Sequence, residues 1–239
     1  MCPTDNMAAY HEFKDKINKT DIRVIFELGS RDLLDAIQLA TDYQSMVYAF
    51  ECNPDCLHEC HKNIAMVSSD ITDRIHLIDK AVSITNGPVS FFSFDLEKYN
   101  NMGASSMLQI DFTKRNVSDP DYGRENPQKE VCVMGTRLDT FIQEENIPKI
   151  DLICMDLQGY EVQALKSLGD DLRNVTYILT ECSIQSTYTN GATFGELYAY
   201  LSSFGFQYVC SNRFGDQFPD LSMHGFSEFD ALFVNSTRA

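Results

Sequence analysis

Short apolar runs alternate with amphipathic segments along this chain, and this alternation limits the fold more than any other feature. The apolar runs have the length and composition of buried strands, and the segments between them carry the apolar spacing of helices. Such alternation is typical of a mainly parallel sheet with helices on both faces. The sequence therefore predicts an α/β fold built on a doubly wound, mostly parallel sheet. Strands are expected at 23–28, 46–51, 74–82, 149–156 and 175–181, and helices at 33–43, from Pro54 onward and at 160–168.

The C-terminal part of the chain predicts a different kind of strand pairing. A helix is expected over 193–204, and two strand-like runs follow at 206–210 and 229–235. The segment between these runs is too short for the usual helical crossover, so the two strands should pair antiparallel. We therefore expect a C-terminal antiparallel hairpin beside the parallel strands.

One domain, residues 1–239, is expected, because the chain has no internal repeats and no long Pro, Ser or Gly tract. Within residues 1–20, a covering helix is expected at about 5–18. The run at 86–94 resembles one arm of a hairpin. Residues 95–130 are polar and weakly periodic, which predicts a lid or insertion, since long irregular loops inside compact domains usually have a function.

The charge of the chain disfavours several classes of partner. It carries 35 acidic against 19 basic residues, for a net charge of -16. That charge repels nucleic-acid backbones and anionic lipid. No apolar run approaches the roughly 20 residues that span a bilayer, and the N-terminus lacks the pattern of a secretion signal. We expect a cytoplasmic protein that neither binds nucleic acid nor inserts into a membrane.

The cysteines pose a separate question, because the chain has 8 of them. Several lie in strand-like runs, where a reduced thiol packs as a small hydrophobe. In "ECNPDCLHECHKN", Cys52, Cys56, Cys60 and His61 could share a helix face, but the CxxC turn common at zinc sites is missing. A helix with incidental thiols is the preferred interpretation.

The turn after the first strand, "VIFELGSRD", suggests which ligand binds at the strand ends. Open α/β sheets bind ligands beyond the carboxyl ends of their strands, where Glu27, Gly29 and Ser30 lie. A dinucleotide site needs GxGxxG so that a pyrophosphate can approach the backbone, and here only Gly29 is present. Asp32 would also place a negative charge where a phosphate should lie. The turn therefore favours a nucleoside without phosphates, with Glu27 receiving a ligand ammonium.

The ends of the next two strands add further candidate contacts. Glu51 ends the second strand, where an acid usually accepts hydrogen bonds from a ribose diol, and Cys52 and Asn53 follow it. Adenosine with a cationic, phosphate-free tail is S-adenosylmethionine, which is therefore the expected cofactor. The residues expected to flank its adenine, at the end of the third strand, are Asp79, Lys80 and Ala81.

Several motifs together resemble those of FkbM-type methyltransferases. They occur in the same order and at roughly the same spacing, from about Val24 to Asn235, and include "VIFELGS", "VYAFECNPD", "GASSM", "TRLDTFIQE", "IDLICMDLQGYEVQAL" and "DALFVN". The resemblance implies a class I methyltransferase (Rossmann-like) fold and methyl transfer to a hydroxyl, often of a sugar or natural product. It also places Ser106, in the small-residue motif, near the cofactor or acceptor. Met155 and Gln158 stand where the family commonly has Lys and Glu.

Methyl transfer to a hydroxyl needs in-line positioning, and a general base or a divalent ion such as magnesium should assist it. Asp156 ends the fourth strand and is the first candidate for base, metal ligand and cofactor contact. Glu181 ends the fifth strand and could pair with Asp156. His224 lies in the connection between the last strands and could overhang the site as a base. Glu161 is interpreted as a first-turn acid that complements its helix dipole. Gln158 cannot act as a carboxylate base or strong metal ligand.

The preferred function is an S-adenosylmethionine-dependent O-methyltransferase for a small-molecule or glycan hydroxyl. An NAD-linked oxidoreductase is an alternative that the missing glycines disfavour. A second alternative is a methyltransferase-like binding scaffold without catalysis, suggested by Met155 and Gln158. The sequence leaves the metal dependence, the acceptor and the oligomeric state open.

Overall fold

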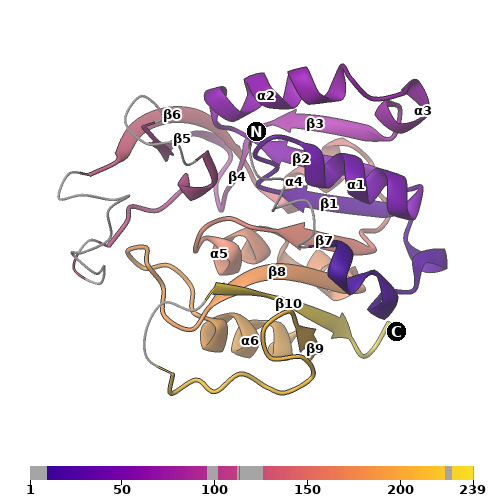
Figure 1. Ribbon diagram of the computed structural model, residues 1–239, viewed down its shortest axis with the longest axis vertical. Helices are drawn as coiled ribbons and strands as arrows, with labels where there is room; N and C mark the ends of the chain where they lie inside the picture. The colour runs from indigo at the N-terminus through magenta and orange to yellow at the C-terminus, as the bar shows by residue number, and fades with distance from the viewer. Residues whose placement is uncertain (1–9, 96–101, 112, 114–125, 224–227, 239) are drawn as a thin grey trace, which may run out of the picture.

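A seven-stranded sheet forms the centre of the protein (Figure 1). The computed structural model describes residues 10–95, 102–111, 113, 126–223 and 228–238. The strand order is β3-β2-β1-β7-β8-β10-β9, with the first five strands parallel and β10 antiparallel to both neighbours. The predicted doubly wound α/β sheet with its antiparallel C-terminal hairpin is thus confirmed. The strands are β1 Val24–Leu28, β2 Met46–Glu51, β3 Ile75–Asp79, β7 Leu152–Met155, β8 Tyr177–Ser183, β9 Phe206–Ser211 and β10 Glu228–Asn235.

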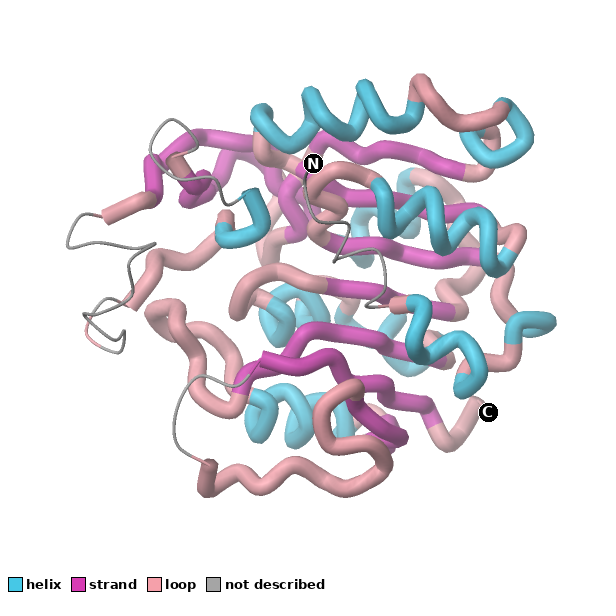
Figure 2. Tube along the Cα trace, viewed as in Figure 1, coloured by secondary structure: helices cyan, strands magenta, loops and turns pink. Residues whose placement is uncertain are grey.

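Helices cover both faces of this sheet, and each face has its own apolar core (Figure 2). One core contains Ala36 and Leu39 of α1 together with Cys60 of α2 and Ile25 of β1. The other packs α4, α5 and α6 against the opposite face of the sheet. Because the parallel strands are covered on both sides, their runs are almost continuously apolar, as the sequence shows. The helices are α1 Leu34–Tyr43, α2 Pro54–Ile64, α3 Ser69–Thr72, α4 Leu138–Glu144, α5 Glu161–Lys166 and α6 Phe194–Ser203.

A second, three-stranded sheet lies beyond the carboxyl ends of the parallel strands (Figure 1). Its order is β4-β6-β5, with β4 Ala81–Val82, β5 Gly87–Phe94 and β6 Gln128–Thr136. The expected hairpin arm is β5, which pairs antiparallel with β6. The single strand predicted at 74–82 is wrong in one respect. The chain turns where the Lys80 N–H donates to the Ile78 carbonyl at 2.8 Å, and Ala81 and Val82 pair with β6 instead.

The expected lid at 95–130 is described only in part. Its last residues belong to β6, which begins at Gln128. Met102–Ala104 form a short 3-10 helix, and Ser106 bridges to Phe92 of β5. Residues 96–101, 112 and 114–125 lie outside the described residues. The lid therefore stays a prediction, anchored to the small sheet by its described residues.

The described N-terminal residues form two short 3-10 helices where one covering helix is expected. These are His11–Lys16 and Lys19–Asp21. Tyr10 and Phe13 are both buried, and their three-residue spacing fits the three residues per turn of a 3-10 helix. The start of the predicted helix, at 5–9, lies outside the described residues. Among the residues that the structure describes, no helix has the length and apolarity needed to cross a membrane.

Candidate active site

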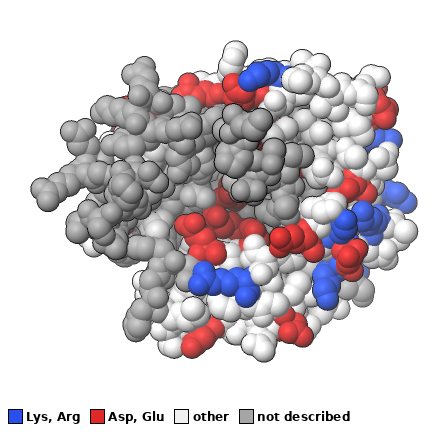
Figure 3. Space-filling view, in the orientation of Figure 1, with Lys and Arg blue, Asp and Glu red and all other residues white. Residues whose placement is uncertain are grey.

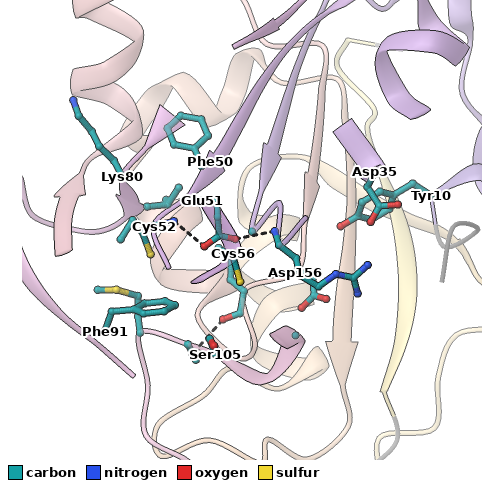
Figure 4. A pocket seen from close by; sticks show the side chains of 18 residues that line it. Tyr10, Asp35, Phe50, Glu51, Cys52, Cys56, Lys80, Phe91, Ser105 and Asp156 are labelled. Atoms are coloured by element: carbon teal, nitrogen blue, oxygen red, sulfur yellow. Dashed lines mark hydrogen bonds between the residues drawn. The ribbon is translucent and has the colours of Figure 1, made fainter. Parts of the chain in front are cut away.

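A cavity of about 770 Å³ opens at the carboxyl ends of β1, β2 and β7 (Figure 4). Part of this volume is open to solvent. Its described lining residues are Tyr10, Gly29, Arg31, Asp35, Phe50, Glu51, Cys52, Cys56, Lys80, Ala81, Val82, Phe91, Gly103, Ser105, Ser106, Met107, Asp156 and Leu157.

Gly29 directly follows β1 and lies against Asp156, which directly follows β7. Its φ is +91°, and a Cβ at this position would lie 2.2 Å from the carbonyl oxygen of Asp156. The N–H groups of Gly29 and Ser30 both donate to the Phe50 carbonyl at 3.0 Å. Glycine is therefore needed here because the ends of the two strands approach each other. The close approach of a phosphate is not needed to explain it. The two N–H groups that a phosphate would seek are already used.

Glu27 in β1 and Ser30 in the turn itself are not among the described lining residues. Both are buried, and the Ser30 hydroxyl donates to the Glu27 carboxylate. Burial, followed by the negative charge of Asp35, raises the pKa of Glu27 well above its usual range. Any effect of these two residues on a ligand in the cavity therefore acts through the turn.

Glu51 lines the middle of the cavity, and its carboxylate is held by backbone groups (Figure 4). One oxygen accepts the Arg31 N–H at 2.7 Å, and the other accepts the N–H groups of Cys52 at 2.8 Å and Asn53 at 2.7 Å. Burial raises the pKa of Glu51 to about 7, against the effect of these three donors. The result is a fixed acceptor that faces the cavity from the end of β2.

Asn53 positions the segments around the cavity and is not among its described lining residues. Its side-chain oxygen accepts the Asp55 N–H at 3.2 Å, which caps α2, and also accepts the Ser93 hydroxyl at 3.2 Å. Its amide nitrogen donates to the Ser105 hydroxyl at 3.2 Å. The helix start, β5 and the Ser105 segment are thereby joined at one side chain. Cys52, directly before Asn53, does line the cavity.

The end of β3 contributes only two of the three residues expected there. Lys80 and Ala81 line the cavity, whereas Asp79 is exposed opposite Glu51 in the β2–β3 register and is not among the described lining residues. Ser106 also lines it, and its hydroxyl donates to the Gln158 carbonyl at 2.9 Å.

Asp156 and Glu181 are brought together by Gln158. The side-chain amide nitrogen of Gln158 lies 2.8 Å from an oxygen of each carboxylate, and the Tyr188 hydroxyl lies 2.8 Å from its side-chain oxygen. Burial, followed by the charge of Asp156, raises the pKa of Glu181 well above its usual range. The acidic pair expected from the sequence is thus formed, with an amide as its bridge. Gln158 has a φ of +52°, a conformation that few side chains adopt.

Glu161 lies in the first turn of α5 and binds the backbone of the turn before it. One of its oxygens accepts the N–H groups of Leu157 at 3.0 Å and Gly159 at 3.2 Å, next to the first turn of α5. Burial raises the pKa of Glu161 to about 7. It therefore holds the turn that carries Gln158.

A smaller cavity of about 270 Å³ lies on the other side of Gln158. Its lining is mostly polar, and part of its volume is open to solvent. The described residues around it are Gln158, Gly159, Glu161, Glu181, Cys182, Ser183, Ser186, Thr187, Tyr188, Ala192 and Glu228.

Two further expectations concern His224 and the cysteines. His224 lies outside the described residues. Cys52, Cys56 and Cys60 are buried free thiols, and the Cys60 thiol donates to the Arg31 carbonyl at 3.4 Å. Within the described ranges, no three His, Cys, Asp or Glu side chains are grouped in a way that could hold a metal ion.

Sequence patterns do not predict several of the lining residues, notably Tyr10, Arg31, Asp35 and Phe91. Tyr10 comes from the N-terminal segment and Phe91 from β5, and neither position is set by the order of the parallel strands. Asp35 reads in the sequence as an ordinary first-turn acid. For Arg31 a signal exists, because it directly follows the Gly29-Ser30 pair.

The strand order, the antiparallel C-terminal hairpin and a cavity at the carboxyl ends of β1, β2 and β7 define a class I methyltransferase fold. The model of the FkbM methyltransferase domain matches residues 30–208, so the chain belongs to this family.

Two individual proteins illustrate these relationships. The chain is 27% identical over 192 residues to the 2-O-methyltransferase NoeI of Sinorhizobium fredii, covering 78% of this chain and 73% of that protein. A structure of M. capricolum TrmK with S-adenosylhomocysteine aligns with a TM-score of 0.50 and 13% identity, covering 99% of this chain and 70% of the other. The latter likeness concerns the fold alone.

Proposed function

We propose that this protein is an S-adenosylmethionine-dependent O-methyltransferase that acts on a hydroxyl of a sugar, a glycan or a related small molecule. The observation that carries the proposal is the fixed carboxylate of Glu51 inside the cavity at the carboxyl ends of the strands. A ribose presents two neighbouring hydroxyl donors, and a carboxylate held in one orientation is a suitable acceptor for them.

The rest of the cavity fits the other parts of this cofactor. Phe50, Ala81, Val82 and Phe91 supply apolar surface beside Glu51, which suits an adenine ring (Figure 4). Asp156 lies at the end of β7 with its side chain toward the same space, where a cationic centre is favoured.

The turn at Gly29 argues against the NAD-linked alternative. A dinucleotide site leaves backbone N–H groups free to bind the pyrophosphate. Here the N–H groups of Gly29 and Ser30 donate to the Phe50 carbonyl, and that of Arg31 donates to Glu51. A pyrophosphate at this turn would have to displace three hydrogen bonds.

Asp156 and Glu181 are proposed to receive the proton of the acceptor hydroxyl. When bound, S-adenosylmethionine would supply the methyl group: the acceptor oxygen would bond to the methyl carbon, and the electron pair of the broken C–S bond would stay on the sulfur. Gln158 holds both carboxyl groups, so that one of them can accept the proton at the edge between the two cavities. General base assistance of this kind is worth about 10² to 10⁴ in rate, and positioning of the acceptor contributes roughly 7 to 11 kcal/mol.

The smaller cavity is proposed to mark the side from which the acceptor approaches. Its polar lining matches a polyhydroxyl compound, and the relative NoeI is named as a 2-O-methyltransferase. Nucleic-acid acceptors are disfavoured by the net charge of -16. On the face in Figure 3, acidic side chains gather near the centre, while several Lys and Arg side chains lie toward one edge.

The test is a methyl-transfer assay with isotopically labelled S-adenosylmethionine. Purified protein is incubated with a panel of sugars, glycans, small-molecule alcohols and RNA, with magnesium or with a chelator, beside the Asp156→Ala variant. The proposal expects labelled methyl ether on a hydroxyl compound, and a large loss in the variant. Labelled RNA alone would contradict the acceptor class. Cofactor binding without any transfer, together with a cellular role that survives Asp156→Ala, would establish the inactive scaffold instead.

A further inference from the structure

The backbone of Arg31 is fixed in an uncommon conformation at the rim of the cavity. Its φ is +52°, in the left-handed region that costs most side chains energy. Its N–H donates to Glu51 at 2.7 Å, and its carbonyl accepts the Cys60 thiol at 3.4 Å. Two hydrogen bonds therefore hold this residue where its side chain lines the cavity.

The surroundings of the Arg31 guanidinium are acidic. It lies 3.3 Å from a carboxylate oxygen of Asp32, and Asp35 and Asp156 line the same cavity. Burial raises the pKa of Asp35 to about 6, and the positive charge of Arg31 acts against that rise. The guanidinium side chain is 32% exposed, which leaves it accessible to a ligand. One end of the cavity thus combines a cation with two carboxyl groups.

The end of the cavity that carries Asp35 lies apart from the end that carries the aromatic rings of Phe50 and Phe91. Figure 4 places Asp35 and Tyr10 on one side of Glu51 and Lys80, Phe50 and Phe91 on the other. A ligand whose sugar lies at Glu51 and whose base lies toward Phe91 would therefore direct its remaining part toward Asp35. In S-adenosylmethionine, that part is an amino acid with one ammonium and one carboxylate.

We propose that Arg31 binds the carboxylate of the cofactor's amino-acid tail, while Asp35 receives its ammonium. The inference rests on the proposed function, and it explains why one arginine stands among acids in a cavity for a cationic ligand. A guanidinium offers two parallel N–H donors that match the two oxygens of a carboxylate. Arg31 therefore selects for the complete tail.

The test compares two ligands by isothermal titration calorimetry. S-adenosylhomocysteine carries the tail, whereas 5′-methylthioadenosine keeps the adenine, ribose and sulfur without it. Arg31→Gln should weaken S-adenosylhomocysteine about 10- to 100-fold, the range expected when a charged hydrogen-bond partner is lost, and change 5′-methylthioadenosine less than about twofold. Gln meets the same left-handed backbone cost as Arg, so the difference isolates the guanidinium.

Asp32→Asn is the matched control, because it removes the ion pair with Arg31 and keeps the arginine. It should leave S-adenosylhomocysteine affinity unchanged or slightly tighter. Equal weakening of both ligands by Arg31→Gln, no weakening of either, or a parallel loss in Asp32→Asn would overturn the inference and leave the proposed function standing. If the unaltered protein binds neither ligand, the proposed function and this inference both fall.

Discussion

Replacing Gly29 with alanine tests the interpretation of the first turn. The φ of +91° is unfavourable for alanine by about 1–2 kcal/mol. The new Cβ would also lie 2.2 Å from the Asp156 carbonyl oxygen, a backbone atom that cannot rotate away. Overpacking of this kind costs typically about 1–3 kcal/mol. The two effects together predict a loss of about 2–5 kcal/mol in the free energy of unfolding.

Gly87→Ala is the matched control for this variant. Its φ is +102°, but nothing lies within 4 Å of the added Cβ. It should lose only the conformational part, about 1–2 kcal/mol. Urea denaturation of both variants gives the two free energies. For a chain of this size, Gly29→Ala should also lower the Tm by roughly 4–20 °C, since 1 kcal/mol corresponds to about 2–4 °C. Equal losses in the two variants would refute the close approach of β1 and β7.

Two further predictions concern the acids around the site. Gln158→Glu would place a third carboxylate between Asp156 and Glu181, so kcat at pH 7 should fall at least about tenfold and recover in part with magnesium. The control is Gln143→Glu at an exposed position, which should leave kcat unchanged. Equal kcat values in the two variants would contradict the bridging role of Gln158. Asp35 has its pKa raised from 3.8 to about 6 by burial, so its contribution to stability is present below about pH 4 and is lost as the pH rises through 6. Chemical denaturation across this window should therefore show the wild-type protein losing stability relative to Asp35→Asn, and parallel curves for the two proteins would show that Asp35 has an ordinary pKa.

Much of the fold follows from local sequence pattern, and the exceptions have physical causes. The parallel strands β1, β2, β7 and β8 are largely buried, so their apolar runs are unambiguous. The run at 74–82 looks continuous because strand composition alone does not show that Ala81 and Val82 pair with a different sheet. The N-terminal segment has helical spacing at Tyr10 and Phe13, but a three-residue spacing fits a 3-10 helix as well as the start of an α-helix.

The site is predictable where strand ends alone determine it. Glu51, Lys80, Ala81 and Asp156 follow from the rule that parallel strands end at one edge, and all four line the cavity. Asp79 does not, because the pleat of β3 directs it to solvent at the position before Lys80.

Tertiary hydrogen bonds determine the remaining site residues, and no sequence pattern encodes them. The bridge from Gln158 to Asp156 and Glu181 joins residues on two strand ends through a left-handed turn. The orientation of Glu51 likewise depends on the Arg31 N–H, which the unusual backbone of Arg31 directs toward it.

A crystal structure with S-adenosylhomocysteine tests the central claim most directly. We predict that the ribose hydroxyls bind the Glu51 carboxylate, that the adenine lies beside Ala81 and Phe91, and that the amino-acid tail points toward Arg31 and Asp35. Density for this ligand away from Glu51, or a dinucleotide with its pyrophosphate over Ser30, would contradict it.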